Sequence, residues 1–207
     1  MKLYLSSFRL GNETEKLKNM VGANGKAAII HNSLDFSTNL ERLAKSKIDE
    51  ANDLKSLGFK PSELDLRDYF GKTGRLREKL KEFGLLWVRG GNTFVLRRAM
   101  RQSGFDEIIK DYVGKDTLVY AGYSAGVCVL SPTLRGLELV DDPNIVPSGY
   151  DKQIIWEGIG LINYSIAPHY KSDHPESAAV SKEVEYFIEN KIPFIALHDS
   201  EVIIETV

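Results

Sequence analysis

The chain has little cysteine: Cys128 is the one cysteine among 207 residues. A single cysteine cannot form an internal disulfide, and chains built on disulfide frameworks belong to oxidising compartments. The N-terminal residues, Met-Lys-Leu-Tyr-Leu, become polar too soon to form a secretory signal. We therefore expect a cytoplasmic protein that is stabilised by its core rather than by covalent cross-links.

A long hydrophobic run and a strong excess of one charge are also missing. No stretch approaches the roughly 20 apolar residues that a membrane-spanning helix needs. The net charge is −2, with lysine and arginine spread along the chain. Electrostatics therefore gives no reason to expect nucleic acid or an anionic membrane as a partner.

Apolar runs and helix-like stretches alternate along almost the whole chain. Strands are predicted at residues 2–5, 27–31, 63–66, 85–88, 118–121, 164–167, 194–197 and 202–204. Helices are predicted at about 38–58, 76–84, 94–102, 105–113 and 175–190, and an irregular excursion or hairpin at 135–159. This alternation predicts an α/β fold, a single domain over residues 1–207 whose mostly parallel sheet has helices on both faces.

The helix expected after residue 38 carries two more specific predictions. Thr38 and Glu41 have the T-x-x-E spacing of a capping box, which would begin the helix. Apolar residues then recur at helical spacing and predict its buried face: Leu40, Leu43, Ala44, Ile48, Ala51 and Leu54.

The motif at residues 122–126, Gly-Tyr-Ser-Ala-Gly, directly follows an apolar strand-like run. Small residues on both sides of a serine, between a strand and a helix, are typical of a nucleophile elbow. Such a turn lifts the hydroxyl of Ser124 clear of the backbone and places the first amides of the next helix beside it. A tight turn whose glycines serve packing alone would give the same pattern.

A serine hydroxyl needs a base to take its proton, so the four histidines were compared. In an open parallel sheet, residues that meet over a ligand come from the carboxyl ends of neighbouring strands. Ser124, His169 and the pair His198-Asp199 each follow a predicted strand. We therefore expect Ser124, His169 and Asp199 to meet at one edge of the sheet.

These three residues can divide the work of a hydrolase. Ser124 would attack a carbonyl, His169 would take the proton, and Asp199 would orient the imidazole. The oxyanion donors would be the backbone amides of Ala125 and of Gly91, which follows another predicted strand. The glycines at 90–91 also suit a plain turn before a helix that Asn92 or Thr93 caps.

Taken together, these motifs resemble the peptidase E family of serine peptidases, the dipeptidase E or aspartyl dipeptidase group, with cyanophycinases as more distant relatives. The resemblance covers residues 85–204 and rests on residues 90–94 (Gly-Gly-Asn-Thr-Phe), 122–126, 131–133 (Ser-Pro-Thr) and 168–170 (Pro-His-Tyr). It implies a fold like that of the class I glutamine amidotransferases, with serine at the elbow. It also implies cleavage of short peptides without a metal or a cofactor. For the chain itself we expect a monomer or a homodimer.

By position, the resemblance implies that Ser124 is the nucleophile, His169 the base, and Gly91 and Ala125 the oxyanion donors. Asp199 stands where the family commonly has glutamate. A further acidic position of the family falls near Leu139, where Glu138 and Asp141 are the neighbouring acids.

The family's best-known members cut after an N-terminal aspartate, which calls for a cation in the first pocket. Lys182 is the nearest basic residue to the matching segment, and Asn92 of the glycine motif is the other expected substrate contact. Lys182 is equally well explained as a solvated helix lysine.

Other readings of the same residues remain open at this point. An α/β-hydrolase esterase shares the elbow, but its acid precedes its histidine, as Asp141 or Asp151 would precede His169 or His198. A non-catalytic relative could use the same cleft to bind a peptide or metabolite, because a fold does not fix an activity.

A metal hydrolase or a cysteine nucleophile fits the sequence less well. His169, Asp173, His174 and His198 could be imagined as ligands, but a spacing of five does not place the first two histidines on one helical face. The sequence contains no H-E-x-x-H. Cys128 lies one helical turn past the elbow, where a small buried thiol is the ordinary explanation.

Overall fold

The computed structural model describes the backbone of residues 1–207 and the side chains of all residues except Arg42. Six strands form the central sheet in the order β3-β2-β4-β5-β1-β8. They are β1 (Lys2–Ser6), β2 (Lys26–Ile30), β3 (Lys60–Glu63), β4 (Leu85–Val88), β5 (Val119–Tyr123) and β8 (Val202–Thr206). All neighbours pair in parallel except β8, which is antiparallel to β1. The mostly parallel sheet predicted from the sequence is confirmed.

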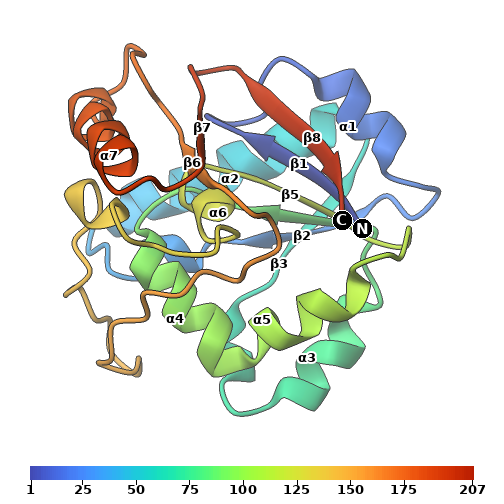
Figure 1. Ribbon diagram of the computed structural model, residues 1–207. Coiled ribbons are helices and arrows are strands. Elements are labelled where there is room, and N and C mark those ends of the chain that lie inside the picture. The colour runs from blue at the N-terminus through green and yellow to red at the C-terminus, as the bar shows by residue number, and fades with distance from the viewer.

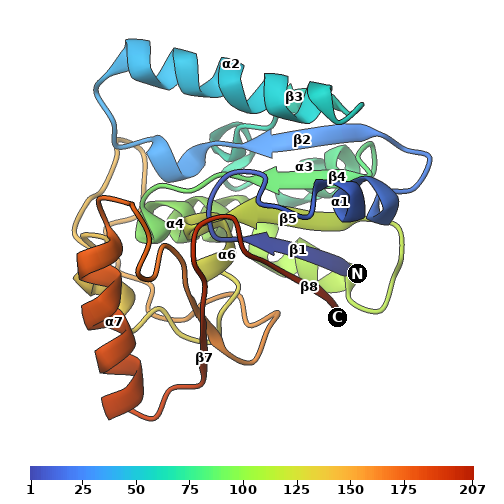
Figure 2. The same ribbon diagram turned by 90° about the horizontal axis from the view of Figure 1, so that it is seen from above.

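Helices cover both faces of this sheet, as Figures 1 and 2 show. On one face lie α1 (Thr14–Met20) and α2 (Leu40–Ser56), and on the other α3 (Thr73–Leu80), α4 (Thr93–Ser103), α5 (Phe105–Ile108) and α6 (Ala125–Cys128). In β4, the side chains of Leu85 and Trp87 are buried on the face covered by α1 and α2. Those of Leu86 and Val88 are buried on the opposite face, under α3 to α6. A strand covered on both faces is therefore apolar throughout, because successive side chains point to opposite faces.

A second, two-stranded sheet lies apart from the central one. It pairs β6 (Ser165–Ala167) with β7 (Phe194–Ala196) in parallel and packs against α7 (Ser177–Glu189). The expectation that both strands belong to the central sheet was wrong. Their carboxyl ends nevertheless reach the same region, because α7 and this sheet stand beyond the carboxyl ends of the central parallel strands (Figure 2).

Two predicted elements are shifted or shortened. The strand predicted at 63–66 is β3, which ends at Glu63, and residues Leu66–Tyr69 form a 3₁₀ turn. Asp65 caps that turn by accepting the Arg67 N–H at 2.9 Å, so the chain leaves the sheet there. The helix predicted at 105–113 ends as α-helix at Ile108 and continues as a 3₁₀ turn to Tyr112.

The face predicted for α2 is only partly buried. Leu54 is fully buried, whereas Leu40 is 76% and Ile48 60% exposed. The helix begins at Leu40, so the predicted capping box at Thr38 does not define its first residue. Only the C-terminal half of α2 packs on the sheet, while its N-terminal half extends toward the strands' carboxyl ends (Figure 2).

The irregular segment expected at 135–159 crosses the carboxyl side of the sheet as an excursion, with a 3₁₀ turn at Leu137–Leu139 and an isolated bridge between Thr133 and Glu157. Arg98 of α4 holds it in place. This guanidinium is 1% exposed and donates to the carbonyl oxygens of Pro143 at 2.8 Å and Gln153 at 3.0 Å.

In the described part of the chain, no helix combines the length and the apolar character needed to cross a bilayer.

Candidate active site

Ser124 lies in a strained turn between β5 and α6. Its backbone has φ 51° and ψ −123°, and α6 begins at the next residue, Ala125. A non-glycine residue at positive φ costs on the order of 1–3 kcal/mol and persists only where its surroundings enforce it. This is the local geometry of a nucleophile elbow.

The glycines that flank Ser124 allow β5 and α6 to lie closely against the end of β4. A Cβ at Gly122 would lie 2.3 Å from the Val88 carbonyl oxygen, and one at Gly126 would lie 2.1 Å from the same atom. Gly90 is equally constrained, because its Cβ would lie 2.8 Å from Cβ of Ser124. The Gly-x-Ser-x-Gly pattern is therefore needed for the turn itself.

His169 follows β6, and Asp199 follows β7. The Nδ1 atom of His169 lies 2.6 Å from Oδ1 of Asp199. Ser7 supports both residues: its Oγ accepts the His169 backbone N–H at 2.9 Å and donates to Oδ1 of Asp199 at 3.2 Å. The Asp199 backbone N–H donates to Oγ of Ser172 at 2.8 Å. The imidazole is thus held at one nitrogen, which leaves Nε2 as its second functional atom.

Ser124 and His169 line one cavity of about 510 Å³. Its walls come from the ends of β4, β5 and β6, from the start of α2 and α7, and from the excursion. Asp199 reaches this cavity only through His169. The structure therefore pairs His169 with Asp199 and places Ser124 at the same cavity as His169, although His169 and Asp199 come from the second sheet.

The electrostatic environment keeps His169 neutral near pH 7. The residue is 1% exposed. Its burial lowers the pKa below the usual 6.5, and the hydrogen bond that His169 donates to Asp199 opposes that shift. A neutral imidazole whose Nδ1–H donates to a carboxylate presents a basic Nε2, the form that can accept a proton.

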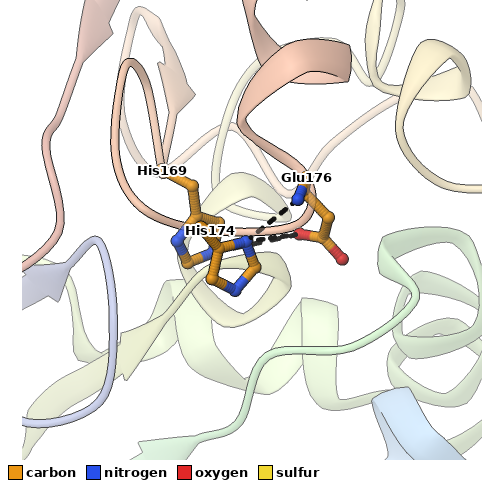
Figure 3. Close-up of side chains that lie close together, drawn as sticks. All are labelled: His169, His174 and Glu176. Atoms are coloured by element: carbon orange, nitrogen blue, oxygen red, sulfur yellow. Dashed lines mark hydrogen bonds and ion pairs between the residues drawn. The ribbon is translucent and has the colours of Figure 1, made fainter.

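The ring of His174 stacks on that of His169, with centroids 3.7 Å apart and planes 8° from parallel (Figure 3). Among the described residues, His169, His174 and Glu176 form the one group of three possible ligands, with atoms within 4.8 Å of one another. Lone pairs of stacked imidazoles lie in parallel planes and do not converge on a common point. This group is therefore not arranged as a metal site.

Of the two expected oxyanion donors, Gly91 lines the cavity and Ala125 directly follows Ser124 in the chain. Gly91 has φ 146°, and a Cβ there would lie 2.7 Å from the Ser33 carbonyl oxygen, so bare backbone is required. Ala125 is the first residue of α6, whose amides point toward the turn at Ser124.

Of the two expected substrate contacts, Asn92 lines the cavity and Lys182 does not. Asn92 is 3% exposed and caps α4: its Oδ1 accepts the Val95 N–H at 2.9 Å, and its Nδ2 donates to the Asp142 carbonyl oxygen. Lys182 is exposed on α7 and is not among the described residues that line the cavity. Asn92 therefore shapes the wall, and the structure does not bring Lys182 to the site.

Charged residues of the cavity that the sequence analysis missed include Arg89 and Glu176. Arg89, directly after β4, lines the cavity and lies 3.1 Å from the buried carboxylate of Glu50. Glu176 lies at the start of α7, with its Oε2 atom 3.9 Å from Nε2 of His169. Arg89 directly precedes the glycine motif, which is the signal that could have pointed to it.

The alternative readings find less support. His169 pairs with Asp199, which follows it, rather than with Asp141 or Asp151, so the order is not that of an α/β-hydrolase. Cys128 is buried, its thiol donates to the Ile166 carbonyl oxygen at 3.4 Å, and its burial raises its pKa well above the usual range. That thiol is not an activated nucleophile.

The chain is similar in sequence to known peptidases. The model of peptidase family S51 matches residues 44–205. An uncharacterised peptidase of Listeria monocytogenes is 28% identical over 149 residues, 71% of this chain and 68% of that protein. Peptidase E of Salmonella arizonae is 34% identical over 99 residues, 48% of this chain and 39% of that protein. The chain thus matches less than half the length of that peptidase E.

A solved structure shares the fold. A crystallised Listeria monocytogenes protein described as a peptidase E superposes with a TM-score of 0.75 and 20% sequence identity, over 100% of this chain and 98% of that one. At this identity the likeness concerns the fold alone.

Proposed function

We propose that this chain, which belongs to peptidase family S51 and is therefore a serine peptidase, hydrolyses short peptides such as dipeptides through Ser124, His169 and Asp199. The observation that carries the proposal is the 2.6 Å contact between Nδ1 of His169 and Oδ1 of Asp199, at the cavity that Ser124 also lines. A buried, neutral imidazole oriented by a carboxylate is the base that a serine hydroxyl needs.

In the first half of the reaction, Oγ of Ser124 bonds to the peptide carbonyl carbon while its proton passes to Nε2 of His169. Asp199 stabilises the positive charge that develops on the ring. The carbonyl oxygen becomes an oxyanion and accepts hydrogen bonds from the amides of Gly91 and Ala125. The carbon–nitrogen bond then breaks, the leaving amine takes the proton from His169, and an acyl ester on Ser124 remains.

In the second half, a water molecule attacks the ester while His169 takes one of its protons. The carbon–oxygen bond to Ser124 breaks, Oγ recovers a proton from the ring, and the carboxylic acid leaves. All protons are thus accounted for by His169 and water, and no cofactor enters the cycle.

The limited size of the cavity supports a short substrate. A volume of about 510 Å³ lies within the 300–1,000 Å³ that is usual for small-molecule sites. Arg89 on one side of the cavity suits the C-terminal carboxylate of a dipeptide. A long polypeptide would not fit within this volume, and its chain would have to extend out of the cavity on both sides of the cleaved bond.

A fluorophosphonate probe tests the nucleophile directly. We expect the protein to be labelled at Ser124 and the Ser124→Ala variant to be unlabelled, with turnover of a dipeptide panel reduced by a factor on the order of 10⁴ or more. Ser56→Ala, at an exposed serine of α2, is the matched control and should label like the unmodified protein. An unlabelled but ligand-binding protein would favour the non-catalytic relative.

A further inference from the structure

A small recess opens from the main cavity beside Ser124. It has room for about one water-sized group, about 10 Å³, and Ser124, Val140, Asp141 and Glu176 line both spaces. Its inner end reaches α7 at Glu183. Three carboxylates therefore surround a space that adjoins the proposed nucleophile, and no lysine or arginine lines it among the described residues.

Glu183 is the unusual member of this group. It is 0% exposed, and neither of its carboxylate oxygens has a hydrogen-bond partner among the described residues. Its neighbours on the buried face of α7, Val180, Val184 and Phe187, are apolar. An unpaired carboxyl group at such a place is costly unless something compensates it. Packing among these apolar neighbours does not itself call for a carboxyl group at position 183.

Asp141 and Glu176 place two further carboxyl groups around the recess. Oδ2 of Asp141 accepts the Thr93 N–H at 2.8 Å, yet burial raises the pKa of this carboxyl to about 7. Burial, together with the charges of Asp141, Glu138 and Glu176, also raises the pKa of Glu183 well above its usual value. A cation placed among these groups would relieve both their burial and their mutual repulsion.

We propose that this acidic recess, formed by Asp141, Glu176 and Glu183, binds the ammonium group of the substrate's first residue. The inference rests on the proposed peptidase function, because Ser124 must attack the carbonyl of the same residue. An ammonium group matches the room available, whereas a planar guanidinium does not. The ammonium is either the α-amino group, which only Cα separates from that carbonyl, or a lysine side chain. A first residue with an anionic side chain finds no cation in this recess.

Four dipeptide substrates show whether the bound ammonium is the α-amino group or a lysine side chain. They are Lys-Ala and norleucyl-Ala, each with a free and with an acetylated α-amino group, and kcat/KM is measured from released alanine. If the recess holds the α-ammonium, both free peptides are at least tenfold better than their acetylated forms. If it holds the side chain, the lysine peptides are at least tenfold better than the norleucine peptides whether or not they are acetylated. In that second case, aspartyl-Ala, whose side chain is anionic, should be the poorest substrate.

Glu183→Gln keeps the shape of the side chain and removes its charge. We expect it to reduce the preference for the cationic substrate over the neutral one at least tenfold. Glu185→Gln, two residues along α7 and exposed, is the control and should leave that ratio unchanged. Should Glu183→Gln fail to fold in a thermal melt, Asp141→Asn provides the same test from the opposite wall.

Binding separates this inference from the peptidase proposal. Calorimetry measures the affinity of the protein for lysine amide and norleucine amide, each free and acetylated, and does not require turnover. Preferred binding of the ammonium ligands that weakens in Glu183→Gln supports the recess even if no peptide is cleaved. The proposed role of the recess is wrong if all peptides are cleaved with similar kcat/KM, or if Glu183→Gln leaves the preference for cationic substrates unchanged. Either result would still be compatible with the proposed peptidase function.

Discussion

Nδ1 of His169 lies 2.6 Å from Oδ1 of Asp199, and the Ser7 hydroxyl contacts both residues. The two partners follow different strands, β6 and β7, whose parallel register keeps their carboxyl ends together. The pair is therefore positioned by the small second sheet, while the central sheet positions Ser124. Relative movement of these two sheets would separate the base from the nucleophile.

Asp199→Asn tests the orienting role of the carboxylate. The amide can donate to Nδ1 and so favours the wrong tautomer of His169, with the proton on Nε2. We expect kcat to fall on the order of 10³- to 10⁴-fold, with little change in the melting temperature. Asp173→Asn, at an exposed aspartate outside the cavity, is the matched control and should keep full activity. A fall below tenfold in Asp199→Asn would assign the orienting role to another residue.

The pH dependence of labelling follows from the burial of His169. Because its pKa lies below 6.5, the basic form is present at and above neutral pH and is lost as the pH falls through that pKa. The rate of labelling by an uncharged fluorophosphonate should therefore have its acidic midpoint below pH 6.5. Asp199 raises this pKa, so Asp199→Asn should move the midpoint to still lower pH. A midpoint well above 6.5 would contradict the assignment of the base.

Much of this site could be predicted from residues whose backbone or burial is tightly constrained. Gly122 and Gly126 admit no Cβ, and the apolar run of β4 fits only a strand covered on both faces. The sequence also predicted that His169 follows the end of a strand, although that strand lies in the second sheet. Backbone constraints of this kind are local, so they are visible in sequence.

The features that sequence reasoning missed depend on contacts between distant segments. Glu183 lies between charged and apolar neighbours on α7, as an exposed helix glutamate would, and only the packing of α7 buries it. In the same way, the periodicity of α2 could not reveal that Leu40 and Ile48 remain exposed. Helical period shows which residues share a face but not what that face meets.

Gly126→Ala should be strongly destabilising. Its Cβ would lie 2.1 Å from the Val88 carbonyl oxygen, so α6 and the end of β4 would have to move apart. We expect a loss of about 1–3 kcal/mol or more in the free energy of unfolding, measured in denaturant, together with loss of fluorophosphonate labelling. Gly74→Ala in α3 is the matched control: its Cβ meets nothing within 4 Å. There the better helix propensity of alanine should leave stability unchanged or raise it by up to about 1 kcal/mol.

Arg98→Met should loosen the excursion that carries Asp141 and Val140 to the cavity. The buried guanidinium donates to the carbonyl oxygens of Pro143 and Gln153, and methionine fills similar space without replacing either bond. Each hydrogen bond to a charged group contributes about 1.5–3 kcal/mol, so a loss of at least about 3 kcal/mol in stability is expected. Hydrogen exchange should rise across residues 137–153, while the central strands keep their protection. Arg101→Met, at an exposed position of the same helix, should change neither quantity. Unchanged exchange in Arg98→Met would mean that the excursion is held by its other contacts, such as the Asn92 bond to the Asp142 carbonyl oxygen.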